Sequence, residues 1–334
     1  MTDRRSTNTD NHHHEHGHTH GAIDPSIITT GRGIWAIKWS FIGLFATAIF
    51  QIFIVLFSGS VALLADTIHN VADAATAIPL WIAFRLARWK PNRRFTYGYG
   101  RVEDLAGLVI VLTILLSAIV AGYESIDRFF HPQTIMHLWS VIVASVVGFL
   151  GNEGVAQFRI KVGNEIGSAA LVADGHHARV DGLTSLSVLF GAVGVWLGYP
   201  LADPIVGLLI TIAIFRIVWE SGKSIFTRML DGVDPEIVDE IRHIVNHTPG
   251  VEGVSDVRVR WLGHRLHAEL NVAVGPELSV ENGHEIAKEV RHHLLHELRY
   301  LSNATIHVDP ANASGEDHHR VTEHEHDDLP LHSH

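Results

Sequence analysis

Apolar residues are gathered along this chain in long blocks rather than spread evenly. Six blocks have the length of about 20 residues that an α-helix needs to cross the hydrocarbon core of a bilayer. They begin near Ile34, Val61, Leu105, Leu138, Ser168 and Ala202. The pattern therefore predicts an α-helical membrane protein whose six transmembrane helices occupy residues 33–222.

After the last block, the apolar residues follow the shorter periods of a soluble domain. Pro235 stands at a helix start, and isoleucines recur after it at helical spacing. Two alternating runs then predict half-buried strands, a second amphipathic helix covers about residues 280–300, and the run ATIHV predicts a last strand. This order of elements predicts a small α+β (ferredoxin-like) domain over residues 231–310.

Both ends of the chain are polar and rich in histidine. Residues 1–32 and 311–334 together hold twelve of the 26 histidines, in low-complexity sequence without apolar periodicity. We expect both tails to be disordered. Metal capture by such tracts and the absence of any specific role are equally open interpretations.

One pattern of charged residues occurs twice inside the apolar blocks. It reads Asp-x-x-His-x-x-x-Asp, and its members are Asp66, His69 and Asp73 in the first copy and Asp174, His177 and Asp181 in the second. Ionisable side chains are costly inside a membrane, so they normally face a bundle interior or a water-filled cavity and mark an ion path. Two copies predict one shared site.

The spacing within each copy separates two roles. A His and an Asp four residues apart lie on one helix face, about 6 Å apart along the axis, and can bind the same ion. Two such pairs, His69 with Asp73 and His177 with Asp181, would give a tetrahedron of two nitrogens and two oxygens, which zinc accepts. The first Asp of each copy is about 10.5 Å from the last along the axis, too far to join the same coordination sphere.

We therefore expect Asp66 and Asp174 to line a vestibule. His176 points about 100° away from its neighbour and is expected to pack or to support the site from outside. The alternative interpretation is that all these polar groups only pair with one another to hold the bundle together. The duplication and the cost of buried charge favour the ion site.

The amino-acid composition limits the classes of partner and of metal ligand. A formal net charge of −11 argues against a nucleic-acid partner, which requires a basic surface. The chain has no cysteine, so a metal site must use histidine and carboxylates.

Basic residues predict the orientation in the membrane, because they collect in cytoplasmic loops. Arg159 and Lys161 are assigned to the connection between the fourth and fifth spans. The connection between the second and third spans carries Arg85, Arg88, Lys90, Arg93, Arg94 and Arg101. Both termini are then cytoplasmic.

Three segments resemble the cation diffusion facilitator family of six-span divalent metal exporters. They are GSVALLADTIHNVADA, YGYGRVEDLAGL and ALVADGHHARVDGLTSLSVL, and the likeness covers about residues 34–310. The resemblance implies a homodimeric metal/proton antiporter of the cell (inner) membrane that uses no cofactor. It also implies a transport site made of His69, Asp73, His177 and Asp181.

The presence of histidine in both ligand pairs resembles the pattern of family members that transport zinc. Transport of another divalent metal, Co²⁺, Cd²⁺, Ni²⁺, Fe²⁺ or Mn²⁺, stays open, since this ligand set is not exclusive to one metal.

Two metal sites of other family members match this chain only in part. The loop site of some members has Asn92, Phe95 and Tyr99 at its positions here, so we expect it to be absent. In the C-terminal domain, His284, His307 and Asp309 match ligand positions, whereas Ser255 and Asn271 replace histidines. The resemblance thus implies a partial, weaker site, in which His307 and Asp309 share one face of a strand.

Other polar residues of the C-terminal part have less specific interpretations. Arg101 and Asp231 match a charge pair that links the two parts of family members, although Arg101 could equally reach to lipid headgroups. We expect an ordinary solvated surface for five further histidines, which are His264, His267, His292, His293 and His296.

Two other classes of function compete with transport. A membrane metalloenzyme would use three protein ligands, an open position for water and a base. Four ligands from two helices, without a nucleophile motif, favour a carrier. A metal-sensing scaffold that uses only the tails and the C-terminal domain would leave the two intramembrane copies unexplained.

Overall fold

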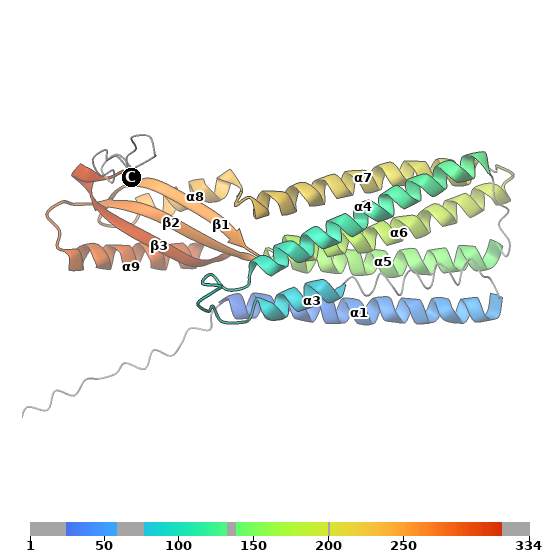
Figure 1. Ribbon diagram of the computed structural model, residues 1–334, viewed down its shortest axis with the longest axis horizontal. Helices are drawn as coiled ribbons and strands as arrows, with labels where there is room; N and C mark the ends of the chain where they lie inside the picture. The colour runs from blue at the N-terminus through green and yellow to red at the C-terminus, as the bar shows by residue number, and fades with distance from the viewer. Residues whose placement is uncertain (1–24, 59–76, 132–137, 200, 316–334) are drawn as a thin grey trace, which may run out of the picture.

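The computed structural model describes residues 25–58, 77–131, 138–199 and 201–315. These residues form an elongated bundle of helices with a small α/β domain at one end (Figure 1). The bundle contains α1 Pro25–Ser58, α3 Ala77–Leu86, α4 Arg101–Phe130, α5 Leu138–Ile166, α6 Ala169–Trp196 and α7 Ala202–Met229. Among the described residues, five of these helices, all except α3, are long and apolar enough to cross a membrane.

The predicted spans match this bundle with shifted boundaries. The span predicted near Val61 lies largely outside the described residues, and α3 is its described end. Arg159 and Lys161 were assigned to a loop, which is wrong: α5 continues through both of them to Ile166. A buried charge resembles the end of a membrane span when only hydropathy is considered, although it can lie inside a helix that faces protein.

Helix α6 lies in the middle of the bundle, packed against α4, α5 and α7. Its small residues allow the close approach that helices in membranes use. A Cβ added to Gly175 would lie 2.7 Å from Cγ1 of Ile160 and 3.1 Å from the carbonyl oxygen of Ala156, both on α5. The helix that carries the second Asp-x-x-His-x-x-x-Asp copy therefore meets α5 at nearly backbone contact.

The C-terminal domain has the predicted order of elements. It consists of α8 Pro235–Asn246, β1 Val251–Leu262, β2 Arg265–Val274, α9 Val280–Glu297 and β3 Leu301–Pro310. The sheet order is β1-β2-β3, with β1 antiparallel and β3 parallel to β2. Side chains from both helices, such as Ile241 and Leu294, share one core with strand residues such as Leu270. Helix α9 ends at Glu297, three residues before the predicted end, because Leu298 turns to an extended conformation.

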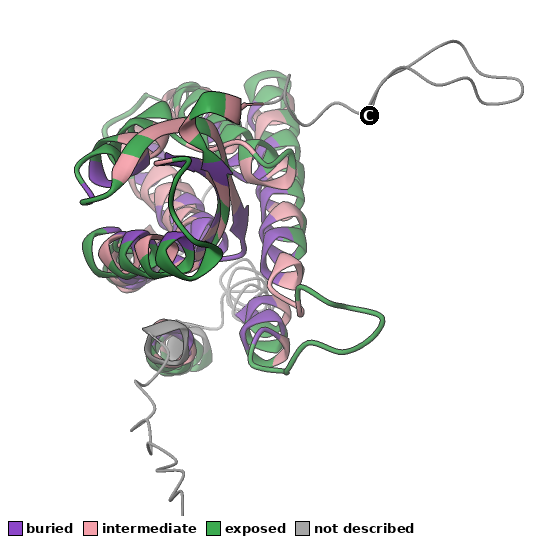
Figure 2. Ribbon diagram, turned by 90° about the vertical axis from the view of Figure 1, so that its left-hand side faces the viewer, coloured by how far each residue is buried: buried purple, intermediate pink, exposed green. Residues whose placement is uncertain are grey.

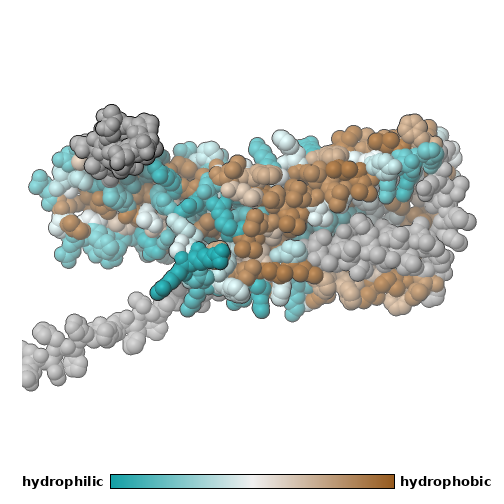
Figure 3. Space-filling view, in the orientation of Figure 1, coloured by the Kyte–Doolittle hydropathy of each residue, from teal (hydrophilic) through white to brown (hydrophobic). Residues whose placement is uncertain are grey.

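The two parts differ in their surfaces. Large exposed apolar side chains lie along the long helices, for example Leu105, Leu112 and Leu116 on α4, whereas the C-terminal domain is largely hydrophilic (Figure 3). In the view along the molecule, the buried residues face inward from the helices and the sheet (Figure 2). An apolar exterior around the helices fits a lipid environment.

Candidate functional site

The second copy of the repeated motif lies on the buried side of α6. His177 and Asp181 are 1% and 9% exposed, and Nδ1 of His177 lies 3.9 Å from Oδ1 of Asp181. The expectation that these two side chains share one helix face is confirmed. An imidazole and a carboxylate thus lie side by side, as half of the predicted tetrahedral site requires.

The first copy, Asp66, His69 and Asp73, lies outside the described residues. The shared site therefore stays a prediction. Within the part of the chain that the structure describes, no group of three or more metal-ligating side chains is gathered.

The predicted vestibule position is wrong for Asp174. It is 0% exposed, and its Oδ2 lies 3.0 Å from Nη1 of Arg159, which is itself 1% exposed on α5. The carboxylate expected in a solvated position is thus buried in an ion pair between two helices. Sequence reasoning missed Arg159 as a site residue, and the signal was a basic residue inside a mostly apolar stretch of 29 residues.

A second ion pair joins the same two helices. Nε and Nη2 of Arg179 donate to the carboxylate of Glu153 at 3.2 and 3.0 Å, and both side chains are partly exposed. His176 is half-buried on α6, as a packing role requires.

The expected solvated surface is wrong for His264, which is 3% exposed. This residue belongs to the turn between β1 and β2, at the point where the sheet meets the start of α4 (Figure 1). Its Nδ1 lies 2.6 Å from Oε2 of Glu103 on α4, and its Nε2 lies 3.1 Å from Oγ1 of Thr30 on α1. These partners are far away in the sequence, so the residues next to His264 could not reveal its burial.

The predicted pair of Arg101 and Asp231 is present at the same junction. Nη2 of Arg101 donates to Oδ1 of Asp231, and its Nη1 donates to the carbonyl oxygen of Arg228 at 2.9 Å. The contact links the first residue of α4 to the second residue after the end of α7, in the connection to the C-terminal domain. The Arg101 side chain therefore binds protein groups here and does not adopt the alternative position among lipid headgroups.

The partial site of the C-terminal domain is smaller than expected. Nε2 of His307 lies 2.9 Å from Oδ1 of Asp309, so these two share one strand face as predicted. His284 is exposed near the start of α9 and forms no three-ligand group with them among the described residues. This correction leaves a two-residue pair within one chain.

The remaining surface histidines are divided. His292 and His296 are exposed, with ring centroids 4.4 Å apart and ring planes tilted by 55°, as a solvated surface allows. His267 is half-buried, and burial followed by the charges of Arg260 and Arg265 lowers its pKa. His293 is also half-buried, with its Nε2 3.1 Å from Glu289.

The loop between α3 and α4 is held by polar contacts among the residues that replace metal ligands. Nδ2 of Asn92 donates to the Tyr99 hydroxyl at 2.7 Å, and Oδ1 of Asn92 accepts from the backbone nitrogens of Arg94 and Phe95 at 2.9 Å. The rings of Phe95 and Tyr99 are 4.8 Å apart. An amide and two aromatic rings thus order this loop.

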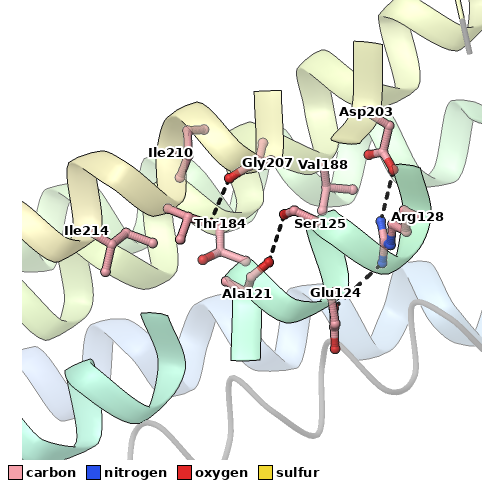
Figure 4. A pocket seen from close by; sticks show the side chains of 12 residues that line it. Ala121, Glu124, Ser125, Arg128, Thr184, Val188, Asp203, Gly207, Ile210 and Ile214 are labelled. Carbon is pink, nitrogen blue, oxygen red and sulfur yellow. Dashed lines mark hydrogen bonds and ion pairs between the residues drawn. The ribbon is translucent and has the colours of Figure 1, made fainter. Parts of the chain in front are cut away.

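A polar cavity of about 70 Å³ lies at the other end of the bundle, between α4, α6 and α7 (Figure 4). Arg128 stands at its edge, with Nη1 3.2 Å from Oδ2 of Asp203 and Nη2 3.8 Å from Oε2 of Glu124. Thr184 lines it from α6, three residues after Asp181. The cavity continues the polar side of α6 toward the end of the bundle that is remote from the C-terminal domain.

Two family models match the chain. The model of the cation efflux transmembrane domain matches residues 37–230, and that of the cation efflux protein cytoplasmic domain matches residues 233–311. Together they cover the helical bundle and the C-terminal domain.

Two relatives agree with these matches. A probable cation efflux system protein of Mycobacterium tuberculosis is 52% identical over 297 residues, which are 88% of this chain and 90% of that protein. The zinc transporter ZitB of Pectobacterium atrosepticum is 30% identical over 224 residues, or 66% and 69% of the two chains. A solved manganese form of the MamM CTD is 28% identical, has a TM-score of 0.22 and covers 23% of this chain and 96% of that one.

Proposed function

Because the chain belongs to the cation efflux family of divalent metal transporters, we propose that it exports zinc from the cytoplasm in exchange for protons. The observation that carries the proposal is the pair of His177 and Asp181, buried side by side on α6. The repeat of the same motif at His69 and Asp73 supplies two further ligands of the same kinds.

The ligand types support zinc as the cargo. Zinc takes imidazole nitrogen and carboxylate oxygen in a tetrahedral arrangement and needs no thiolate, which this chain lacks. A relative named as a zinc transporter matches two thirds of the chain. Co²⁺, Cd²⁺, Ni²⁺, Fe²⁺ and Mn²⁺ are the alternatives to be compared with zinc in the assay below.

Proton exchange follows from the chemistry of the ligands. Zinc binds neutral imidazole and ionised carboxylate, so its binding displaces protons and its departure allows them to return. His177 and Asp181 would then carry either the metal or protons between the two sides of the membrane. The buried position of both groups limits their exchange with water outside the transport path.

The orientation and assembly are part of the proposal. Because Arg159 lies within α5, the loop between α3 and α4 carries the argument for the cytoplasmic side. Four of its basic residues, Arg88, Lys90, Arg93 and Arg94, are exposed, and so is Arg85 in the last turn of α3. Both termini and the C-terminal domain are then cytoplasmic, in a homodimer of the cell (inner) membrane. The match to the cytoplasmic domain of the family supports this side.

The test is zinc flux in proteoliposomes with and without an imposed pH gradient. Asp73→Ala and Asp181→Ala should each abolish flux while membrane insertion and dimerisation persist, since each helix supplies half of the ligands. Glu220→Gln is the matched control, because Glu220 is an exposed carboxylate whose partner, Arg216, is exposed on the same helix.

Several results would count against the proposal. Near-normal zinc flux in either alanine variant would remove the shared site, and a faster flux of another metal under the same gradient would replace zinc as the cargo. Zinc flux that is unchanged when the pH gradient is collapsed, with no protons released on binding, would replace antiport by facilitated diffusion.

A further inference from the structure

The β1–β2 turn is inserted into the end of the helical bundle. A Cβ added to Gly263, which has φ +65°, would lie 2.7 Å from the carbonyl oxygen of Gly100, so the turn and the start of α4 meet backbone to backbone. The next residue, His264, also packs on Phe84 of α3, with ring centroids 5.5 Å apart. Helix α3 begins four residues after Asp73 and belongs to the predicted second span.

Glu103 connects this turn to the start of α6. One carboxylate oxygen, Oε2, lies 2.6 Å from Nδ1 of His264, and the other, Oε1, accepts from Oγ of Ser168 at 2.5 Å. Both partners and Glu103 itself are at most 3% exposed. Hydrogen bonds to an ionised group are short and strong, and a buried carboxylate that loses a partner bears the desolvation cost alone.

Ser168 is the N-cap of α6. Its Oγ accepts from the backbone nitrogen of Leu171 at 3.0 Å, which fixes the first turn of the helix. The same helix carries His177 and Asp181 about two and a half and three and a half turns further along. A continuous series of contacts therefore runs from His264 through Glu103 and Ser168 to α6, the helix that carries His177 and Asp181.

A second series of contacts runs in parallel. Nη1 of Arg228 donates to the carbonyl oxygens of Gly263 and Gly167, at 3.2 and 2.6 Å. Gly167 is the residue before Ser168, so both series join the β1–β2 turn to the α5–α6 turn. Tyr300 adds a direct contact, because its hydroxyl donates to the carbonyl oxygen of Asn164 at 2.8 Å.

We propose that Glu103 and His264 are positioning residues through which the C-terminal domain sets the position of α6 and thereby the rate of metal transport. The inference rests on transport by His177 and Asp181, as proposed above. A shift of the sheet relative to the bundle cannot occur while both carboxylate oxygens of Glu103 keep their partners. The chain of contacts thus transmits such a shift to the first turn of α6.

The experiment compares Ser168→Ala, His264→Ala and the double variant in the full chain in proteoliposomes, with zinc as the probe. Ser168→Ala removes one hydroxyl and leaves the contact of His264 with Glu103 in place. Ser168→Thr and His264→Asn are the conservative variants, which keep a hydroxyl and a side-chain N–H. Glu269→Gln is the control, because its partner, Arg260, lies on the same hairpin away from the junction, with partly exposed side chains.

Each alanine variant should lower the maximal rate about threefold to thirtyfold, with KM within about twofold of wild type. Since both act through Glu103, the double variant should be no slower than the slower single variant. Hydrogen–deuterium exchange of the first turn of α6, at Leu171, should become faster in both. The conservative variants and the control should keep both readouts near wild type.

Multiplication of the two rate effects in the double variant would show independent contacts and overturn the proposal. Wild-type rates with unchanged exchange at Leu171 in Ser168→Ala would do the same, whether or not His264→Ala folds. If wild type moves no zinc, the proposed function fails. The exchange measurement then decides the coupling by itself: faster exchange in His264→Ala supports it, and unchanged exchange refutes it.

Discussion

Removing one partner of the Arg159–Asp174 pair should destabilise the bundle strongly. The side chains are 1% and 0% exposed and their charged atoms are 3.0 Å apart, so no water replaces the lost partner. Breaking such a buried pair costs about 3–5 kcal/mol, because one charge stays buried without compensation. Arg159→Met and Asp174→Leu are the two single changes.

The double change should recover most of that loss. Nε and Nη2 of Arg159 have no hydrogen-bond partner among the described residues, so the pair does not fully offset the cost of burying its charges. Replacement of a buried pair by apolar side chains of similar size is often neutral or stabilising. Arg159→Met with Asp174→Leu should therefore lie within about 1 kcal/mol of wild type or above it.

Thermal unfolding in detergent, followed by tryptophan fluorescence at one scan rate, measures these changes. A loss of about 3–5 kcal/mol corresponds to a fall in Tm of about 6–20 °C at the sensitivity of a domain of this size. The matched control is Arg179→Met, which breaks the partly exposed pair with Glu153 between the same two helices. That pair is not fully buried, so the control leaves no completely buried charge without a partner and should lose less stability than Arg159→Met. Equal losses in the Arg159 and Arg179 variants, or a double variant as unstable as the sum of its singles, would refute the argument.

Three other changes test the C-terminal domain and its attachment. The pKa of His267 is lowered mainly by burial and then by Arg260 and Arg265, so protonation of this side chain favours the unfolded state. The stability that neutral His267 contributes should be fully present above the ordinary imidazole pKa of about 6.5 and should fall at lower pH. His267→Gln should make the unfolding midpoint fall less steeply as the pH is lowered. Gly263→Ala should loosen the docking of the hairpin, because φ +65° and the nearby carbonyl oxygen both exclude a Cβ, and faster limited proteolysis of the connection after α7 would report it. His307→Ala should lower the metal sensitivity of transport more than its maximal rate, since the described residues gather His307 with Asp309 and no third ligand; complete loss of flux in a folded variant would contradict this ranking.

The accuracy of the sequence predictions depended on how local each interaction is. Six apolar blocks and the pairing of His177 with Asp181 follow from hydropathy and from helix geometry over a few residues, so both were predictable. The strand face shared by His307 and Asp309 is local in the same way. The order of elements in the C-terminal domain follows from short apolar periods and turn residues.

The predictions that failed depend on partners distant in the sequence. His264 was assigned to the surface because histidine is less often fully buried than apolar residues are, but its partner Glu103 is 161 positions away. Arg159 was assigned to a loop because a charge lowers the hydropathy of its surroundings, although Asp174 on the next helix compensates it. No local pattern contains the information that these charges meet.

The length of α4 makes the contacts between its first turn and the C-terminal domain sensitive to the surrounding bilayer. Its 30 residues extend about 45 Å, whereas the hydrocarbon core is about 30 Å thick, so about 15 Å of the helix lies among headgroups or in water. Glu103 and Asp104 stand in its first turn, together with Arg101. A thicker membrane would draw more of this turn toward the hydrocarbon, and anionic headgroups would compete for its arginine. The thickness of the bilayer and the charge of its lipids thus bear directly on the contacts that hold the C-terminal domain to α6.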